Sequence, residues 1–115
     1  GCAQLKQLPD FLAKKRALAE RYVELFKDVS CGRIFVEPAN SRSNYWLNAF
    51  LLDEKFSSER NPILSHLHER QILARPVWEL LNRLSMYKDC PRMDLSTAES
   101  LERRLINLPS GASLA

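Results

Sequence analysis

The chain has 115 residues, a length that suits one domain with a modest hydrophobic core. Its 17 basic residues are interspersed with 14 acidic ones and give a formal charge of only +3, so no basic block indicates a nucleic-acid groove. The apolar runs are far shorter than the roughly eighteen residues that span a bilayer, and the N-terminal GCAQLKQL has no signal-peptide pattern. Composition therefore predicts a cytoplasmic protein that binds neither nucleic acid nor a membrane.

Residues 1–29 are predicted to form a long amphipathic helix. Between Leu8 and Phe26 the apolar side chains recur at helical spacing and form one wide stripe, with charged side chains around it. Pro9 lies near the beginning, where a first helical turn tolerates proline. The chain opens on helix-forming residues without a capping residue, so we expect the beginning of the protein to lie elsewhere.

Two strands follow in the predicted order of elements. The segment RIFVEP, residues 33–38, is rich in β-branched and aromatic side chains and closes at a proline. A short polar connection leads to a longer strand over residues 44–52, and such a connection favours an antiparallel pair.

The longer strand raises a question about its two faces, because side chains alternate along a strand. One face carries Asn44, Trp46 and Asn48. The other face, predicted to point into the core, carries Tyr45, Leu47 and Ala49. The polar face has two interpretations: a solvent-facing strand, or a surface for a polar ligand.

The second half of the chain predicts further helices and one more strand. Asn61-Pro62 begins a short helix that ends near Arg70, and residues 72–77 return as a third strand, parallel to its predecessor if both share a sheet. Residues 78–84 are a short helix candidate. The capping box at residues 96–99 starts a last helix that continues through Leu105 to Pro109. The predicted fold is α/β (α+β): a small mixed or antiparallel sheet of about three strands packed with helices, with residues 33–115 as its body.

Candidate catalytic and metal-binding residues are few. His66 and His68 are two positions apart and do not share a helix face, and the three cysteines form no CxxC pair, so we predict reduced thiols and no metal site. No serine or cysteine lies in a nucleophile elbow, and three glycines provide no phosphate-binding loop. Arg75 and Trp78 remain: either the guanidinium binds an anionic ligand, or it packs on the indole.

The order of motifs resembles the C-terminal portion of the DegT/DnrJ/EryC1/StrS family of pyridoxal-phosphate-dependent sugar aminotransferases. The resemblance covers nearly the whole chain, and its most specific segments are SNYWLNAFLL, RPVW, YKDCPRMDL and ERRLINLPS. It is strongest to enzymes that aminate UDP-linked 4-keto sugars in nonulosonic (legionaminic-type) acid biosynthesis. The implied fold is the small domain of fold-type I pyridoxal phosphate enzymes.

The resemblance also implies what residues 1–115 do not carry. The family's cofactor-bearing lysine and phosphate-binding residues lie in a preceding large domain, so no catalytic or cofactor-binding residue is expected here, and no activity from this chain alone. The resemblance implies that the chain contributes dimer contacts and one wall of a cleft for a nucleotide sugar. That wall would be formed by Asn44, Trp46, Asn48, Arg75 and Trp78.

Three positions depart from the family pattern in the sugar-facing region. Asn82 stands where relatives often carry histidine, and Ser85 and Gly111 replace a more usual proline and serine. We expect self-association through apolar surface on the first helix and at a sheet edge. The alternatives are a stand-alone protein-interaction module, or a non-functional fragment that binds no small molecule.

Overall fold

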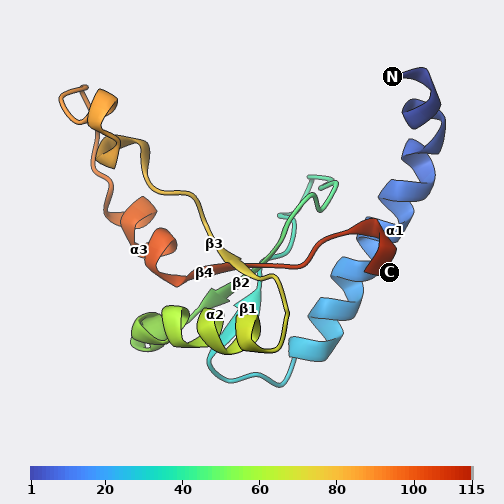
Figure 1. The fold of residues 1–115 in the computed structure, drawn as a ribbon, viewed down its shortest axis with the longest axis horizontal. Helices are drawn as coiled ribbons and strands as arrows, with labels where there is room; N and C mark the ends of the chain where they lie inside the picture. Colours follow the sequence, from blue (N-terminus) through green and yellow to red (C-terminus); the bar gives the residue numbers. More distant parts are fainter. Residues whose placement is uncertain (115) are drawn as a thin grey trace.

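The computed structural model describes residues 1–114, in which helices surround a small β-sheet (Figure 1). The helices and strands in chain order are α1 (Cys2–Phe26), β1 (Gly32–Ile34), β2 (Asn48–Leu52), α2 (Arg60–Glu69), β3 (Arg75–Pro76), α3 (Ser96–Arg104) and β4 (Leu105–Leu108). Short 3-10 helices lie at Glu54–Glu59, Leu81–Arg83, Ser85–Tyr87 and Ala112–Leu114.

The sheet has the strand order β1-β2-β4-β3, and each neighbouring pair is antiparallel. The predicted α+β fold with a small antiparallel sheet is confirmed, with four strands in place of about three. β3 runs in the same direction as β2, as expected for a strand that returns after α2. β4 nevertheless lies between them, so the last strand of the chain is an internal strand of the sheet.

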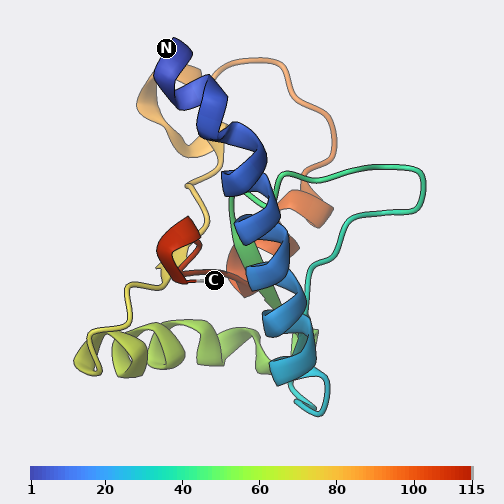
Figure 2. The ribbon, with the colours of Figure 1, turned by 90° about the vertical axis from the view of Figure 1, so that its right-hand side faces the viewer.

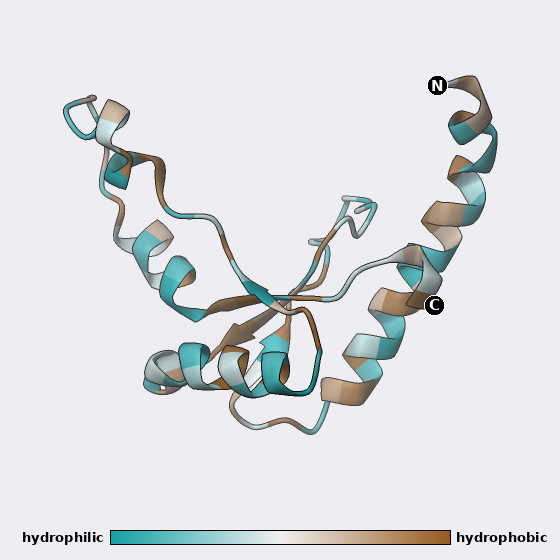
Figure 3. Ribbon diagram, viewed as in Figure 1, coloured by the Kyte–Doolittle hydropathy of each residue, from teal (hydrophilic) through white to brown (hydrophobic). Residues whose placement is uncertain are grey.

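The hydrophobic core lies between the sheet and the two longest helices. Phe50 and Leu52 of β2 share one face by strand alternation, and Ile106 of β4 joins them in the buried cluster. Leu64 of α2 and Phe26 of α1 pack against this cluster, with the rings of Phe26 and Phe50 5.0 Å apart. In Figure 3 the internal strands are accordingly among the most hydrophobic parts of the ribbon. Burial of each such side chain contributes about 1.5–3 kcal/mol.

Helix α1 has two halves with different surroundings. Its C-terminal half packs on the body of the molecule and buries Leu18. Its N-terminal half projects beyond the sheet (Figures 1 and 2), where Leu5, Leu8 and Phe11 stay exposed. The helix begins at Cys2, so Pro9 lies inside it rather than at its start.

The predicted strand over residues 44–52 is wrong in its first half. β2 begins only at Asn48, and Tyr45 has a φ of 45°, a left-handed conformation that breaks strand alternation. By strand alternation Asn48 shares its face with Phe50 and Leu52 and points into the core, with 1% of its surface exposed, so the face predicted to be polar is the buried one. Asn44 and Trp46 lie in the preceding loop, so the three residues do not form one strand face.

Two other predicted strands are shorter than expected. The first ends at Ile34, although the Phe35 amide still donates to the carbonyl of Ala49 at 2.8 Å. The third is reduced from residues 72–77 to Arg75–Pro76, because a proline cannot donate to the ladder. The short helix predicted over residues 78–84 is one 3-10 turn at Leu81–Arg83.

The predicted extension of the last helix to Pro109 is also wrong. Helix α3 ends at Arg104, and residues 105–108 form β4. The expected capping box does not form: the Ser96 hydroxyl donates instead to the Asp94 carboxylate at 2.5 Å. At α2 the helix begins at Arg60, and Asn61 is not its N-cap.

None of the helices in residues 1–114 combines the length and the apolar composition that a bilayer crossing requires. Within the same residues, no group of three histidine, cysteine or acidic side chains gathers in a metal-binding arrangement.

Candidate functional site

A pocket of about 400 Å³ opens where β3 and the end of β4 meet the loop that precedes β2. It is lined by Trp46, Leu47, Leu73, Arg75, Pro76, Trp78, Asn107, Leu108, Pro109 and Ser110. Most of the wall is aromatic or aliphatic, and three side chains supply polar groups. A mostly apolar concavity with a few polar groups is the usual form of a small-molecule site.

Two indoles face this pocket and belong to the only tryptophans of the chain, Trp46 and Trp78. Their ring centroids are 6.2 Å apart and their planes are tilted by 33°. Both remain widely exposed, at 65% and 70%. Exposed indole faces can stack on a planar ring or on the apolar face of a sugar.

Arg75 provides the positive charge of the pocket. It lies on the edge strand β3, opposite Asn107 of β4, and is exposed. Its guanidinium takes part in none of the ion pairs or cation–π contacts of residues 1–114, so packing on Trp78 is not observed there. A guanidinium without a carboxylate partner can bind phosphate or carboxylate oxygens in a bidentate manner.

The two asparagines of the predicted site lie outside the pocket lining. The side-chain oxygen of Asn44 accepts a hydrogen bond from the Trp46 amide at 3.0 Å and so shapes the turn that presents this indole. Asn48 is buried below the pocket, where its backbone amide and its side-chain amide donate to the Ser110 hydroxyl at 2.8 and 3.2 Å. The structure thus brings Trp46, Arg75 and Trp78 together and leaves both asparagines outside the lining of the pocket.

Sequence reasoning missed two polar residues of the pocket, Asn107 and Ser110. Asn107 donates from its side chain to the Pro76 carbonyl at 3.3 Å, which links β4 to β3 beside Arg75. Asn107 had little signal in the sequence, because LINL does not alternate in polarity and its conformation as β4 is decided by pairing with β2 and β3. Ser110 had no such signal either, because its hydrogen-bond partners Asn48 and Lys15 are distant in the sequence.

A second cavity of about 420 Å³ lies within the long segment that connects β3 to α3. It is lined by Leu80, Leu81, Asn82, Tyr87, Cys90, Pro91, Arg92 and Leu95. Asn82, one of the departures from the family pattern, therefore lines a cavity. The cavity is separate in its lining from the pocket of Trp46 and Trp78.

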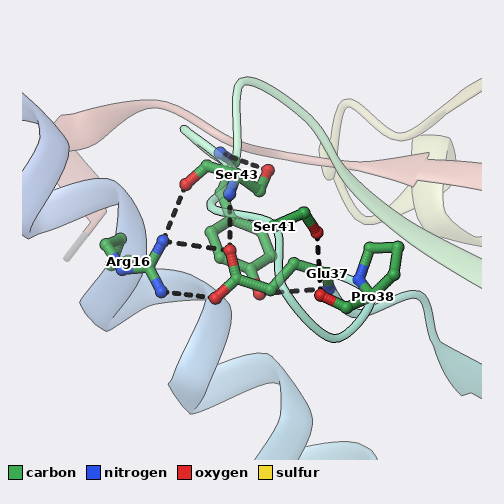
Figure 4. Close-up of polar contacts among 6 residues, drawn as sticks. Arg16, Glu37, Pro38, Ser41 and Ser43 are labelled. Atoms are coloured by element: carbon green, nitrogen blue, oxygen red, sulfur yellow. Dashed lines mark hydrogen bonds and ion pairs between the residues drawn. The ribbon is translucent and has the colours of Figure 1, made fainter.

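The loop that carries Trp46 is fastened to α1 by an ion pair (Figure 4). Arg16 donates from its two terminal nitrogens to the Glu37 carboxylate at 2.6 and 3.2 Å, and to the Ser43 carbonyl at 2.7 Å. The same guanidinium lies 5.4 Å from the ring centroid of Tyr45. The pKa of Glu37 is held below its usual value mainly by the hydrogen bonds from Arg16 and secondly by the hydrogen bond from the Ser43 amide.

These features define an α+β domain with a candidate small-molecule pocket at one edge of its sheet. The model of the DegT/DnrJ/EryC1/StrS aminotransferase family matches residues 1–115, and the chain belongs to this family.

Two curated relatives match this chain over its whole length with about 30% sequence identity. GDP-perosamine synthase of Escherichia coli O157:H7 is 32% identical over 115 residues, which cover 100% of this chain and 30% of that protein. UDP-4-amino-4,6-dideoxy-N-acetyl-beta-L-altrosamine transaminase of Helicobacter pylori is 29% identical over 118 residues, covering 99% and 31%. The chain therefore spans less than a third of the length of these relatives.

A solved structure extends the comparison to the fold. Helicobacter pylori PseC, an aminotransferase involved in the biosynthesis of pseudoaminic acid, superposes with a TM-score of 0.89 at 28% identity. The match covers 100% of this chain and 31% of PseC. The fold of this chain is thus that of the small domain of an aminotransferase.

Aminotransferases of this family use pyridoxal phosphate, and the described residues do not fit a site for it. No lysine lines the pocket of Trp46 and Trp78. Lys15 donates to two backbone carbonyls, whereas Lys14 and Lys27 pair with acidic side chains on the exposed surface of α1 or just beyond its end. A cofactor site needs a reactive lysine beside phosphate donors, and the pocket that holds Arg75 provides only the second of these.

Proposed function

We propose that residues 1–115 form the C-terminal domain of a pyridoxal-phosphate-dependent nucleotide-sugar aminotransferase. In this proposal the pocket of Trp46, Arg75 and Trp78 is one wall of the cleft for the nucleotide sugar. The observation that carries it is the gathering of two exposed indoles and an uncompensated guanidinium in one pocket of a chain from a sugar aminotransferase family. The names of two relatives, which refer to GDP- and UDP-linked sugars, support this substrate class.

Each group has a role that follows from its chemistry. The indoles stack on a ring of the ligand, and Arg75 binds phosphate oxygens. Asn107 and Ser110 provide hydrogen-bonding groups at the pocket wall. Asn44 and Asn48 act indirectly, the first through the turn that presents Trp46 and the second through Ser110.

In this proposal the chain binds substrate and does not itself carry out amino transfer. Incubation with pyridoxal phosphate and reduction with borohydride should therefore leave no stoichiometric adduct on a single lysine. Intact-mass and peptide mass spectrometry measure this directly. One dominant modified lysine would contradict the assignment of the chemistry to another part of the enzyme.

Intrinsic fluorescence tests the substrate-binding role, because both tryptophans line the pocket. UDP-N-acetylglucosamine and GDP-mannose are titrated separately, with N-acetylglucosamine and inorganic phosphate as reference ligands. We expect saturable quenching by a nucleotide sugar and a higher melting temperature, since a ligand that binds only the folded state stabilises it. If neither nucleotide sugar quenches fluorescence or raises the melting temperature, the interaction-module or non-functional alternative is favoured.

The Arg75→Gln variant locates the binding. Loss of a charge-assisted contact of about 1.5–3 kcal/mol should weaken nucleotide-sugar binding by about tenfold or more. Arg33→Gln is the matched control, because Arg33 is an exposed arginine on β1 outside the pocket lining. Equal affinities of the two variants for the nucleotide sugar would show that Arg75 does not contact the ligand.

A further inference from the structure

Lys15 lies where helix α1 meets two segments that are distant in the sequence. Its ammonium group donates to the carbonyl oxygen of Trp46 at 2.8 Å and to that of Ser110 at 2.5 Å, across separations of 31 and 95 positions. Both accepting residues line the pocket between the indoles, whereas Lys15 does not. The lysine therefore reaches two residues of the pocket wall through hydrogen bonds to their carbonyls.

The loop around Ser110 is also held from the side of the sheet. Its hydroxyl accepts two hydrogen bonds from Asn48 and donates to the Leu108 carbonyl at 2.8 Å. Asn48 belongs to β2 and is buried, so this attachment is fixed by the sheet. Ser110 is consequently held by the sheet through its hydroxyl and by α1 through its carbonyl.

Trp46 has fewer attachments of its own. It precedes β2 and takes no part in the strand ladder, and its amide donates to Asn44 within the same turn. In the described part of the chain, the bond from Lys15 is the hydrogen bond that ties the Trp46 backbone to another element. Without that bond the turn carrying this indole would depend on local contacts and on the Arg16 ion pair nearby.

The chemistry of Lys15 suits a bridge between carbonyls. An ammonium group has three donors and no acceptor, and no carboxylate in residues 1–114 forms an ion pair with it. Partial burial of the ammonium group lowers its pKa. An arginine could donate to both carbonyls from its forked guanidinium, and a methionine of similar length could donate to neither.

We propose that Lys15 is a positioning residue for this pocket, which joins the walls formed by Trp46 and Ser110 and thereby sets the orientation of the Trp46 indole against that of Trp78. Its effect on ligand binding rests on the proposed function. Its effect on the indole pair is a property of the chain itself and can be measured without any ligand.

Circular dichroism of the indole pair provides that measurement, because two indoles 6.2 Å apart couple and give an exciton couplet. Trp78→Phe, which leaves one indole, shows which part of the spectrum belongs to the couplet. We expect Lys15→Met to lose the couplet and to make Trp46 more accessible to acrylamide, and Lys15→Arg to restore both. Lys14→Met is the matched control, because Lys14 pairs with Asp10 on the exposed surface of the same helix.

The outcomes separate this proposal from the proposed function. A couplet that is unchanged in Lys15→Met overturns it, whatever the result with nucleotide sugars. If Lys15→Met does not fold, Lys15→Gln is used, whose shorter side chain cannot bridge both carbonyls as the ammonium group does. An unchanged couplet in that variant shows that the bridge does not set the indole pair and overturns the proposal equally. If Lys15→Met loses the couplet but the wild-type chain binds no nucleotide sugar, the proposed function is refuted and the positioning role of Lys15 stands.

Discussion

At the scale of single residues, Asn48 is an unusual component of a sheet core. It is 1% exposed, and its side-chain oxygen is the one buried side-chain polar atom without a partner among the described residues. A buried oxygen without a hydrogen bond costs about 1–3 kcal/mol. The side-chain amide is therefore costly for stability, and it contributes one hydrogen bond to the Ser110 hydroxyl, beside the bond from the Asn48 backbone amide.

Replacing the Asn48 side chain should lower the free energy of unfolding less than removing the Ser110 hydroxyl to which it donates. Asn48→Val eliminates the unpaired oxygen and keeps the backbone bond to Ser110, so we expect an unfolding free energy within about 1 kcal/mol of the wild type. Ser110→Ala leaves both buried donors of Asn48 unpaired and should cost about 1–3 kcal/mol. Urea unfolding of both variants measures the difference, and a greater loss in Asn48→Val would contradict it.

Gly32 is required for close approach of the first two strands. A methyl group at this position would lie 2.4 Å from the Leu51 carbonyl oxygen and 2.8 Å from the Phe50 ring. Backbone atoms of the neighbouring strand cannot move away easily, because they belong to the sheet ladder.

Gly32→Ala should therefore destabilise the fold by about 1–3 kcal/mol, the usual cost of overpacking. The control is Gly111→Ala, where the added methyl group would meet only the Ser113 hydroxyl at 3.5 Å. Thermal and urea unfolding compare the two. Similar melting temperatures for both variants would show that β1 can shift away from β2.

At the scale of elements, the loop from Glu37 to Tyr45 depends on the charge of one carboxylate. Glu37 has its pKa lowered by Arg16, so its stabilising contribution is complete above its unfolded pKa. As the pH falls through the lowered folded pKa, the carboxylate is protonated and the contribution is lost. The loop should thus detach from α1 in acid before the whole chain unfolds.

Hydrogen exchange of the Ser43 amide, which donates to Glu37, measures this detachment as a function of pH. We expect faster exchange relative to the core amides below the pKa range of a free glutamate. In Glu37→Gln the Ser43 amide should exchange rapidly at every pH. Asp10→Asn, which breaks an exposed pair on the same helix, is the control and should leave the pH dependence unchanged.

Elements whose conformation is set by neighbouring residues could be predicted from the sequence, whereas those set by distant partners could not. Helix α1 could be predicted because the stripe from Leu8 to Phe26 is periodic over many turns. β4 could not, because Leu105 and Ile106 continue the helical pattern of α3 equally well, and pairing with β2 and β3 decides their conformation. The alternating burial of its four residues appears only once the sheet exists.

The same distinction applies to the candidate site. Trp46, Arg75 and Trp78 could be proposed from residue type and from the family resemblance, and the structure brings them together. Alternation counted from Asn44 and Trp46 misplaces Asn48, because the left-handed Tyr45 keeps those two residues out of the strand. Counted from Phe50 and Leu52, alternation would have predicted the buried position of Asn48. Lys15 was not separable from the other lysines of α1 by sequence, since its two acceptors are backbone carbonyls.

At the scale of the whole molecule, the projecting half of α1 exposes a row of apolar side chains. Leu5, Leu8 and Phe11 are 65%, 44% and 39% exposed and recur on one side of the helix. Exposed apolar patches of this kind favour association. We therefore expect the chain to self-associate at high concentration.

Leu8→Glu places a charge in this row and should weaken self-association by about tenfold or more, a change of about 1.4 kcal/mol. Ala13→Glu adds the same charge at another exposed position of the helix and should have little effect. Sedimentation over a concentration series measures both. A wild-type chain that stays monomeric at every concentration would count against an interface on α1.

The internal position of β4 also determines when the sheet can form during synthesis. β3 pairs with β4, and β2 has β4 as its second neighbour, yet residues 105–108 are synthesised after the other three strands. Until they emerge from the ribosome, β1 and β2 can form only a hairpin, which is marginal in water on its own. The fold should therefore close in a late step with pairing across long sequence separations, which is the slow kind of step in folding.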